Sequence, residues 1–122
     1  MYTLRAMSEI VIYHNPRCTK SREALAILEA SKAKPRVIEH LKTPPDAKTL
    51  KDLLKKLGLR PRDIIRENEE EFCSLRLDDP KKSDDELIAA IVAHPILLQR
   101  PIVVRGDRAI VARPPEKVKE LL

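Results

Sequence analysis

Residues 10–41 read IVIYHNPRCTKSREALAILEASKAKPRVIEHL, and their pattern sets the architecture of the N-terminal part of the chain. The first four residues form an apolar run that ends in His14-Asn15-Pro16, a turn signal, so residues 10–13 predict a buried strand. Residues 21–30 carry apolar side chains at helical spacing, and residues 37–41 predict a second strand. A strand, a helix and a strand in succession form a βαβ unit, so the two strands are expected to be parallel.

A helical block is expected next. Residues 50–57 have a leucine-rich face followed by Gly58, where the glycine after a helix belongs. Residues 61–76 predict a further helical stretch, with a proline in its first turn. Ser83 begins a capping box in front of an apolar helix that Pro95 ends.

The C-terminal part predicts a hairpin and a final helix. Strands are expected over 102–104 and 109–111, joined by a two-residue turn at Gly106-Asp107 with glycine first. The pair Pro114-Pro115 then opens a helix that carries Val118, Leu121 and Leu122.

The resulting order is βαβ, a helical block, then ββα. This order predicts an α/β protein with a thioredoxin-like fold, in which both halves share one mixed four-stranded sheet. We therefore expect a single domain over residues 1–122, with a helical insertion over approximately residues 46–99.

The composition of the chain excludes several classes of function. The net charge is +5, but aromatic residues, which would stack on bases, make up only 2% of the chain, so no nucleic-acid partner is expected. No apolar run approaches the roughly 20 residues of a membrane span, and no apolar segment follows Arg5, so we expect a cytoplasmic protein without a membrane partner. The two cysteines, Cys18 and Cys73, should be free thiols, and no metal site is expected because CxxC and paired Cys/His spacings are absent.

Cys18 stands where the first strand has ended and the first helix begins. The first N–H groups of a helix lack partners and favour a negative charge, and Arg17, Lys20 and Arg22 add positive charge nearby. These features predict a reactive thiolate at Cys18. Ser21 occupies the second cysteine position of a CxxC motif, which excludes a two-cysteine cycle here; it could hydrogen-bond the thiolate or simply satisfy helix N–H groups.

The segment YHNPRCTKSR, residues 13–22, resembles the HNPxCxxSR signature of glutaredoxin-coupled arsenate reductases, the ArsC family. The similarity extends over nearly the whole chain from about Ile10 and includes residues 62–68, 94–104 and 113–116. It is strongest with the short members of the family, and Met7 resembles their usual start. The resemblance implies a thioredoxin-like fold with an inserted helical subdomain, in agreement with the element order.

The resemblance also implies roles for individual residues. Cys18 would be the nucleophile, and the oxyanion would be bound by Arg66, Arg100 and Arg113. Supporting positions around the thiolate would be His14, Asn15 and Ser21, and Pro101 matches the cis proline that this fold carries beside its active site.

For two of the three arginines, their positions next to the hairpin strands support a shared site independently of the resemblance. Arg100 precedes the first hairpin strand and Arg113 follows the second, so antiparallel pairing should bring them to one end of the hairpin. Arg66 has no such local argument and rests on the resemblance.

The implied activity is reduction of arsenate or a similar oxyanion by a monomer without a bound cofactor. Glutathione would act as co-substrate and glutaredoxin would resolve the mixed disulfide, while Cys73 would be structural or incidental. Two alternatives stay open: a glutathione-dependent thiol/disulfide reductase of the same fold, and a Spx-like regulator that binds RNA polymerase. Ser21 argues against the regulator, and the three arginines favour oxyanion chemistry over both.

Overall fold

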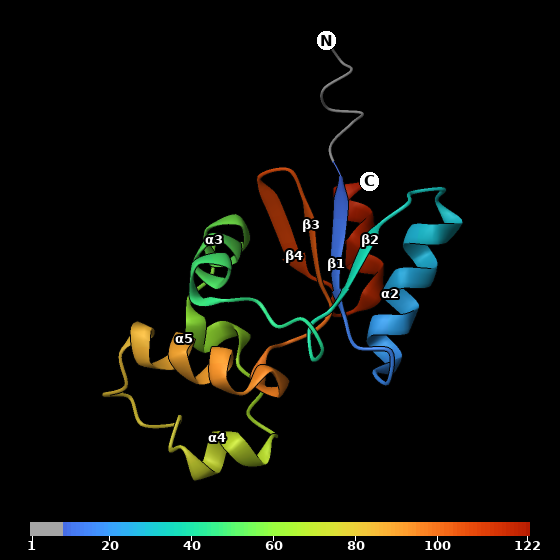
Figure 1. Ribbon diagram of the computed structural model, residues 1–122. Helices are drawn as coiled ribbons and strands as arrows, with labels where there is room; N and C mark the ends of the chain where they lie inside the picture. Colours follow the sequence, from blue (N-terminus) through green and yellow to red (C-terminus); the bar gives the residue numbers. More distant parts are fainter. Residues whose placement is uncertain (1–8) are drawn as a thin grey trace. The chain divides into compact units, whose positions relative to one another are not determined.

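A four-stranded mixed sheet runs through the computed structural model, which describes residues 9–122 (Figure 1). The strand order is β2-β1-β3-β4, with β1 at Ile10–His14, β2 at Arg36–Glu39, β3 at Ile102–Arg105 and β4 at Arg108–Val111. Strands β1 and β2 are parallel, whereas β1 with β3 and β3 with β4 are antiparallel. The predicted βαβ unit, hairpin and thioredoxin-like α/β class are confirmed. The start considered at Met7 lies outside the described residues.

Two helical segments cover one face of this sheet. Helix α2 (Thr19–Ala30) packs against the 3-10 helix η3 (Pro115–Leu121), and both contribute to the core with β1 and β3. The members of this core are Ile10, Ile12, Ala24, Leu28, Val103, Ala112, Val118 and Leu121. Each fully buried Leu, Ile or Val contributes on the order of 1.5–3 kcal/mol. This packing holds α2 against β1 and β3.

The hairpin turn has the geometry that the sequence predicts. Gly106, the first residue of the turn, has a φ of +63°. Asp107, the second, does not have a positive φ, because among the non-glycine residues of 9–122 only Lys32 and Arg76 do. At the opposite end of the hairpin Ile102 pairs with Val111.

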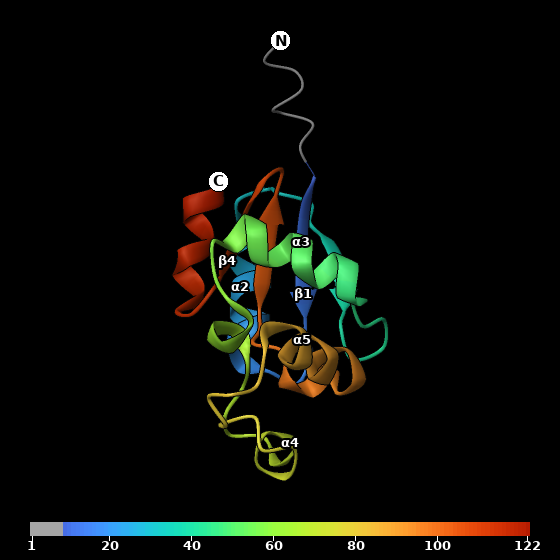
Figure 2. The same ribbon diagram turned by 90° about the vertical axis from the view of Figure 1, so that its left-hand side faces the viewer.

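The chain divides into two compact units, one formed by residues up to Glu39 together with Arg100–Leu122, and the other by His40–Gln99. The predicted insertion over residues 46–99 lies within the second unit. Its elements are α3 (Ala47–Leu57), η1 (Pro61–Ile64), α4 (Glu70–Ser74), α5 (Asp84–Ala93) and η2 (Pro95–Leu97). Helix α5 packs against α3, η1 and η2, while the short α4 lies away from α3 (Figure 2).

Local capping explains where the two longer helices of the second unit begin and end. The Asp46 carboxylate accepts a hydrogen bond from the Thr49 N–H at 2.8 Å, and Gly58 ends α3 with a φ of +69°. Ser83 and Glu86 form the predicted capping box, with N–H to side-chain distances of 3.0 and 3.1 Å. These interactions confirm the predicted end of α3 at Gly58 and the predicted start of α5, while α3 begins three residues before the stretch expected from Leu50.

The helical stretch predicted over residues 61–76 is wrong as a continuous element. Ile65 has extended backbone angles and forms an antiparallel β-bridge with Leu98, so η1 ends before it and α4 begins later. The Arg66 N–H donates to the Leu97 carbonyl at 2.7 Å. Pairing with a segment distant in sequence therefore overrides local helix propensity here.

Three smaller expectations also differ from the structure. The second strand ends at Glu39, and Leu41 is 43% exposed rather than part of it. The final helix is of the 3-10 type and ends at Leu121, so Leu122, expected on this helix, lies just beyond it and is exposed.

Among residues 9–122 no helix combines the length and the apolar character that a membrane crossing requires.

Candidate active site

Cys18 is the N-cap residue of α2, in the loop that leaves β1. Its N–H donates to the Asn15 carbonyl at 2.9 Å, and its own carbonyl accepts from the Arg22 N–H at 3.0 Å as the helix begins. The thiol is free and half-buried, and no side-chain cap hydrogen bond is formed. The turn therefore holds the sulfur at the positive end of a twelve-residue helix.

Several groups act on the ionisation of this thiol. Burial raises the pKa of Cys18, but the Ser21 N–H, the Arg100 guanidinium and the Lys20 N–H together outweigh burial, so the pKa lies below its ordinary value. Arg100 acts both through its charge and through a hydrogen bond to the sulfur. It is only 8% exposed, so solvent screens its charge weakly. The arrangement favours a thiolate.

His14, Asn15 and Ser21 form a buried hydrogen-bond network behind the Cys18 loop. His14 Nδ1 lies 2.6 Å from Ser21 Oγ, and the Asn15 N–H donates to the same oxygen at 3.1 Å. Ser21 is fully buried, and burial lowers the pKa of His14, which favours the neutral imidazole. The Ser21 hydroxyl thus binds the loop, while its backbone N–H acts on the thiol.

The loop is tied further by polar contacts of its own residues. Asn15 Oδ1 accepts from the Arg17 N–H at 3.0 Å, and Arg22 Nη1 donates to the Pro16 carbonyl at 2.8 Å. Arg17, Lys20 and Arg22, which the sequence offered as nearby positive charges, all have exposed side chains. Arg100, more than eighty residues away in the chain, is instead the cation that lowers the Cys18 pKa.

The hairpin places Arg100 and Arg113 beyond the same end of its two strands. The Ala112 N–H donates to the Pro101 carbonyl at 2.9 Å, which continues the pairing past Ile102 and Val111. Arg100 is buried and Arg113 is exposed. The Arg100–Pro101 peptide bond is cis, in keeping with the resemblance, and Arg113–Pro114 is cis as well, which the sequence did not indicate.

Arg66, the third predicted arginine, belongs to the second compact unit. Its Nε–H donates to Glu69 Oε2 at 3.0 Å, and both side chains are mostly buried, with exposed fractions of 19% and 23%. Glu69 was not among the residues predicted from the sequence. The signal available was its position three residues after Arg66, a spacing at which opposite charges pair when the backbone turns.

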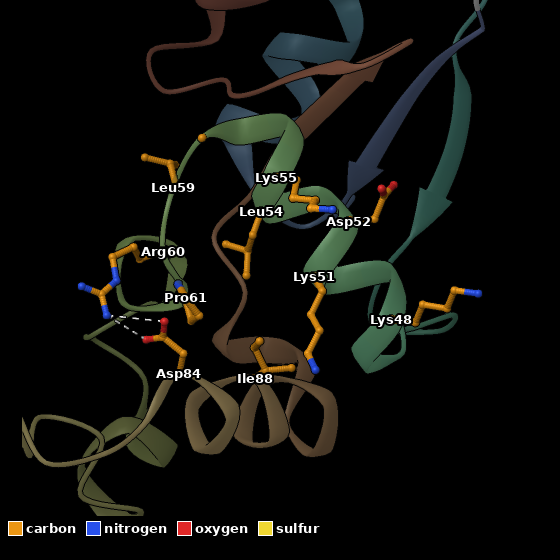
Figure 3. A pocket seen from close by; sticks show the side chains of 11 residues that line it. Lys48, Lys51, Asp52, Leu54, Lys55, Leu59, Arg60, Pro61, Asp84 and Ile88 are labelled. Carbon is orange, nitrogen blue, oxygen red and sulfur yellow. Dashed lines mark hydrogen bonds and ion pairs between the residues drawn. The ribbon is translucent and has the colours of Figure 1, made fainter.

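The second unit also contains an open groove of about 720 Å³ between α3, η1 and α5 (Figure 3). Leu54, Leu59 and Ile88 provide apolar surface, and Arg60 Nη2 forms an ion pair with Asp84 at 3.3 Å. None of the predicted site residues lines this groove. Across residues 9–122 there is also no group of three or more His, Cys, Asp or Glu residues that could hold a metal ion.

Comparison with known proteins identifies relatives of this chain. The model of the ArsC family matches residues 13–121. The chain is 46% identical to "Uncharacterized protein YfgD" of Escherichia coli over 115 residues, which cover 93% of this chain and 97% of that protein. It is 45% identical to an arsenate reductase of Neisseria meningitidis over 117 residues, 95% of this chain and 100% of the relative.

A solved structure gives the same result. Arsenate reductase from Vibrio cholerae superposes with a TM-score of 0.92 at 48% sequence identity, covering 94% of this chain and 98% of that one. The family model matches most of the chain, and both relatives are covered almost completely. This chain belongs to the ArsC family.

Proposed function

We propose that this protein is an arsenate reductase with Cys18 as its nucleophile. The observation that carries the proposal is the half-buried thiol at the N-terminus of α2, whose pKa the Ser21 N–H and the buried Arg100 lower. Relatives named arsenate reductase, 45% and 48% identical to this chain, support arsenate as the substrate.

Arginines are needed because a thiolate and an oxyanion repel each other. At about 4 Å and an effective dielectric of about 20, one pair of unit charges costs on the order of 4 kcal/mol. Lowering the thiol pKa raises the thiolate fraction but makes each thiolate less nucleophilic, so the net gain from that source is small. Charge-assisted hydrogen bonds, worth about 1.5–3 kcal/mol each, offset the repulsion. Arg66, Arg100 and Arg113 are proposed to supply them.

The first proposed step is a substitution at arsenic. The Cys18 thiolate forms a sulfur–arsenic bond, and one arsenic–oxygen bond breaks, with the oxygen leaving as water after protonation. Arsenic remains As(V) in this adduct. The arginines hold the remaining oxygens, and the guanidinium fork fits two of them at once.

The reducing electrons come from external thiols. A glutathione thiolate attacks the Cys18 sulfur, the sulfur–arsenic bond breaks, and its electron pair stays on arsenic, which leaves as arsenite, As(III). Glutaredoxin then attacks the glutathione sulfur of the mixed disulfide and releases the Cys18 thiolate. The overall reaction consumes arsenate and two thiols and yields arsenite, water and one disulfide.

The proposal is tested by arsenate-dependent NADPH oxidation in the presence of glutathione, glutaredoxin and glutathione reductase. The protein should turn over arsenate, and Cys18→Ser should not. A parallel reaction with a glutathionylated peptide in place of arsenate tests the thiol/disulfide reductase alternative. Efficient reduction of the peptide with no arsenate turnover would contradict the proposed activity.

A further inference from the structure

The Arg66–Glu69 ion pair has no assigned part in the reaction proposed above. It joins Nε and Oε2 at 3.0 Å, and both side chains are mostly buried. Exposed ion pairs contribute little to stability, but pairs in a shielded setting impose geometry on both partners. The pair therefore fixes the direction of the Arg66 guanidinium.

The Glu69 carboxylate binds Arg66 rather than its own helix. Glu69 is the N-cap residue of α4, a position that Ser, Thr, Asp or Asn usually fills when a side chain caps the helix, and its carboxylate forms no cap hydrogen bond. It accepts from Arg66 Nε–H instead.

The Arg66 backbone is held as firmly as its side chain. Its N–H donates to the Leu97 carbonyl at 2.7 Å, next to the β-bridge between Ile65 and Leu98. Within residues 9–122, the Glu69 carboxylate is the only hydrogen-bond or ion-pair partner of the guanidinium. Among these residues, neither terminal nitrogen of the guanidinium has a hydrogen-bond partner.

We propose that Glu69 is a positioning residue, which holds Arg66 by its Nε edge and leaves the terminal nitrogens to bind the substrate oxyanion. This inference rests on the proposed function, in which Arg66 contacts arsenate. The fork of a guanidinium binds two oxygens only when its plane is fixed, so a restrained Arg66 loses less conformational freedom on binding.

The sign of the effect separates positioning from simple electrostatics. If Glu69 acted only through its charge, removing that charge would strengthen oxyanion binding. If it positions Arg66, Glu69→Ala should weaken binding even though a negative charge is lost. Glu69→Gln keeps an oxygen that accepts from Nε–H, so it should restore binding to the level of the unaltered protein.

The experiment measures KM for arsenate, kcat and the thermal unfolding midpoint in Glu69→Ala, Glu69→Gln and a control, Glu67→Ala. Glu67 is exposed and has no ion pair among the described residues. We expect Glu69→Ala to raise KM by about three- to tenfold with a smaller change in kcat, as for a lost hydrogen bond. Glu67→Ala should change KM less than twofold. In an Arg66→Ala background, Glu69→Ala should have no further effect on KM.

A second measurement does not depend on turnover. Arsenate, or sulfate as an inert oxyanion, should slow alkylation of Cys18 by iodoacetamide, and Glu69→Ala should raise the concentration that gives half protection by the same factor. The inference is overturned if protection is unchanged or stronger in Glu69→Ala, if only the unfolding midpoint falls, or if neither anion protects Cys18. If Glu69→Ala weakens the protection of Cys18 as expected but the protein does not turn over arsenate, the result would contradict the proposed function and support the positioning role of Glu69.

Discussion

Cys18 and Cys73 are both free thiols, but they lie in regions of opposite character. Cys18 occupies the N-cap position of a twelve-residue helix that packs into the sheet core, and the buried Arg100 lowers the pKa of the Cys18 thiol. Cys73 is exposed in α4, a five-residue helix without buried residues. Residues 67–86 around Cys73 carry 9 Asp and Glu against 3 Lys and Arg.

The difference shows what makes a thiol suited to oxyanion chemistry. A long helix anchored in a core presents fixed N–H groups to a sulfur, and a buried cation adds charge that solvent does not screen. A short helix rich in carboxylates offers neither, and its charges repel an anion. Placement in the fold, rather than residue type, separates the two cysteines.

Substituting each cysteine in turn tests the difference between Cys18 and Cys73, and it should give the largest effect. Cys18→Ser should lower kcat for arsenate by about three orders of magnitude or more, as removal of a nucleophile does in other enzymes. Cys73→Ala should remain within about twofold, because nothing in its surroundings assists the reaction. Comparable losses in both variants, measured in the coupled NADPH assay, would remove the distinction.

The next effect concerns Arg100. Arg100→Ala removes a buried charge that hydrogen-bonds the thiol, so kcat/KM should fall about 10- to 150-fold, on the scale of one charge-assisted hydrogen bond. Arg100→Lys keeps the charge but loses the fork, so it should restore activity only in part. The pH midpoint of Cys18 alkylation should rise in Arg100→Ala.

Exposed arginines of the same hairpin serve as comparisons. Arg113→Ala should cost less than Arg100→Ala because Arg113 is exposed, and Arg108→Ala at the turn should be nearly silent. Arg105 is a poorer control, because its Nη1 donates to the Leu121 carbonyl at 2.8 Å and its loss would loosen η3. Equal losses in the Arg100 and Arg108 variants would contradict the hairpin geometry.

Ser21 allows backbone and side-chain contributions to be separated. Ser21→Ala leaves His14 Nδ1 and the Asn15 N–H without their hydrogen-bond partner, so the free energy of unfolding should fall by about 1–3 kcal/mol, measured with urea. The backbone N–H that acts on Cys18 is retained. The pH midpoint of Cys18 alkylation should therefore stay close to that of the unaltered protein, whereas a large rise would show that the hydroxyl is the stabilising group.

The smallest expected effect is the dependence of stability on pH. Because folding lowers the Cys18 pKa, the folded protein binds the thiol proton less tightly than the unfolded chain, whose pKa is about 8.5. The stabilisation is complete above that value and is lost as pH falls through the lower folded pKa. The difference in unfolding free energy between the unaltered protein and Cys18→Ser should therefore grow with rising pH in this window. A flat difference in urea titrations would contradict the lowered pKa.

Much of the fold follows from local sequence signals. The apolar run at Ile10, the glycine at position 106 and the capping box at Ser83 each specify an element through neighbouring residues alone. The helix expected over 61–76 failed because Ile65 pairs with Leu98, a partner more than thirty residues away. Local propensity carries no information about that pairing.

The candidate site also has features that local sequence predicts and features that it does not. The place of Cys18 at a helix start could be predicted, because the end of one element and the start of the next are local features. The burial of Arg100 and the exposure of Arg113 depend on packing between distant segments. The hydrogen bond between Ser21 and His14 spans only seven residues, but it depends on the conformation of the loop between β1 and α2. The Arg66–Glu69 pair needed the break between η1 and α4, which the sequence had not shown.

In the proposed reaction the Cys18 thiolate attacks arsenate and passes through a mixed disulfide with glutathione. The most direct test is intact-protein and peptide mass spectrometry after incubation with arsenate and glutathione, with glutaredoxin omitted so that the disulfide accumulates. The expected result is one glutathione on Cys18, formed only when arsenate is present, together with release of arsenite. Modification of Cys73 instead, or equal modification of Cys18 without arsenate, would contradict this reaction sequence.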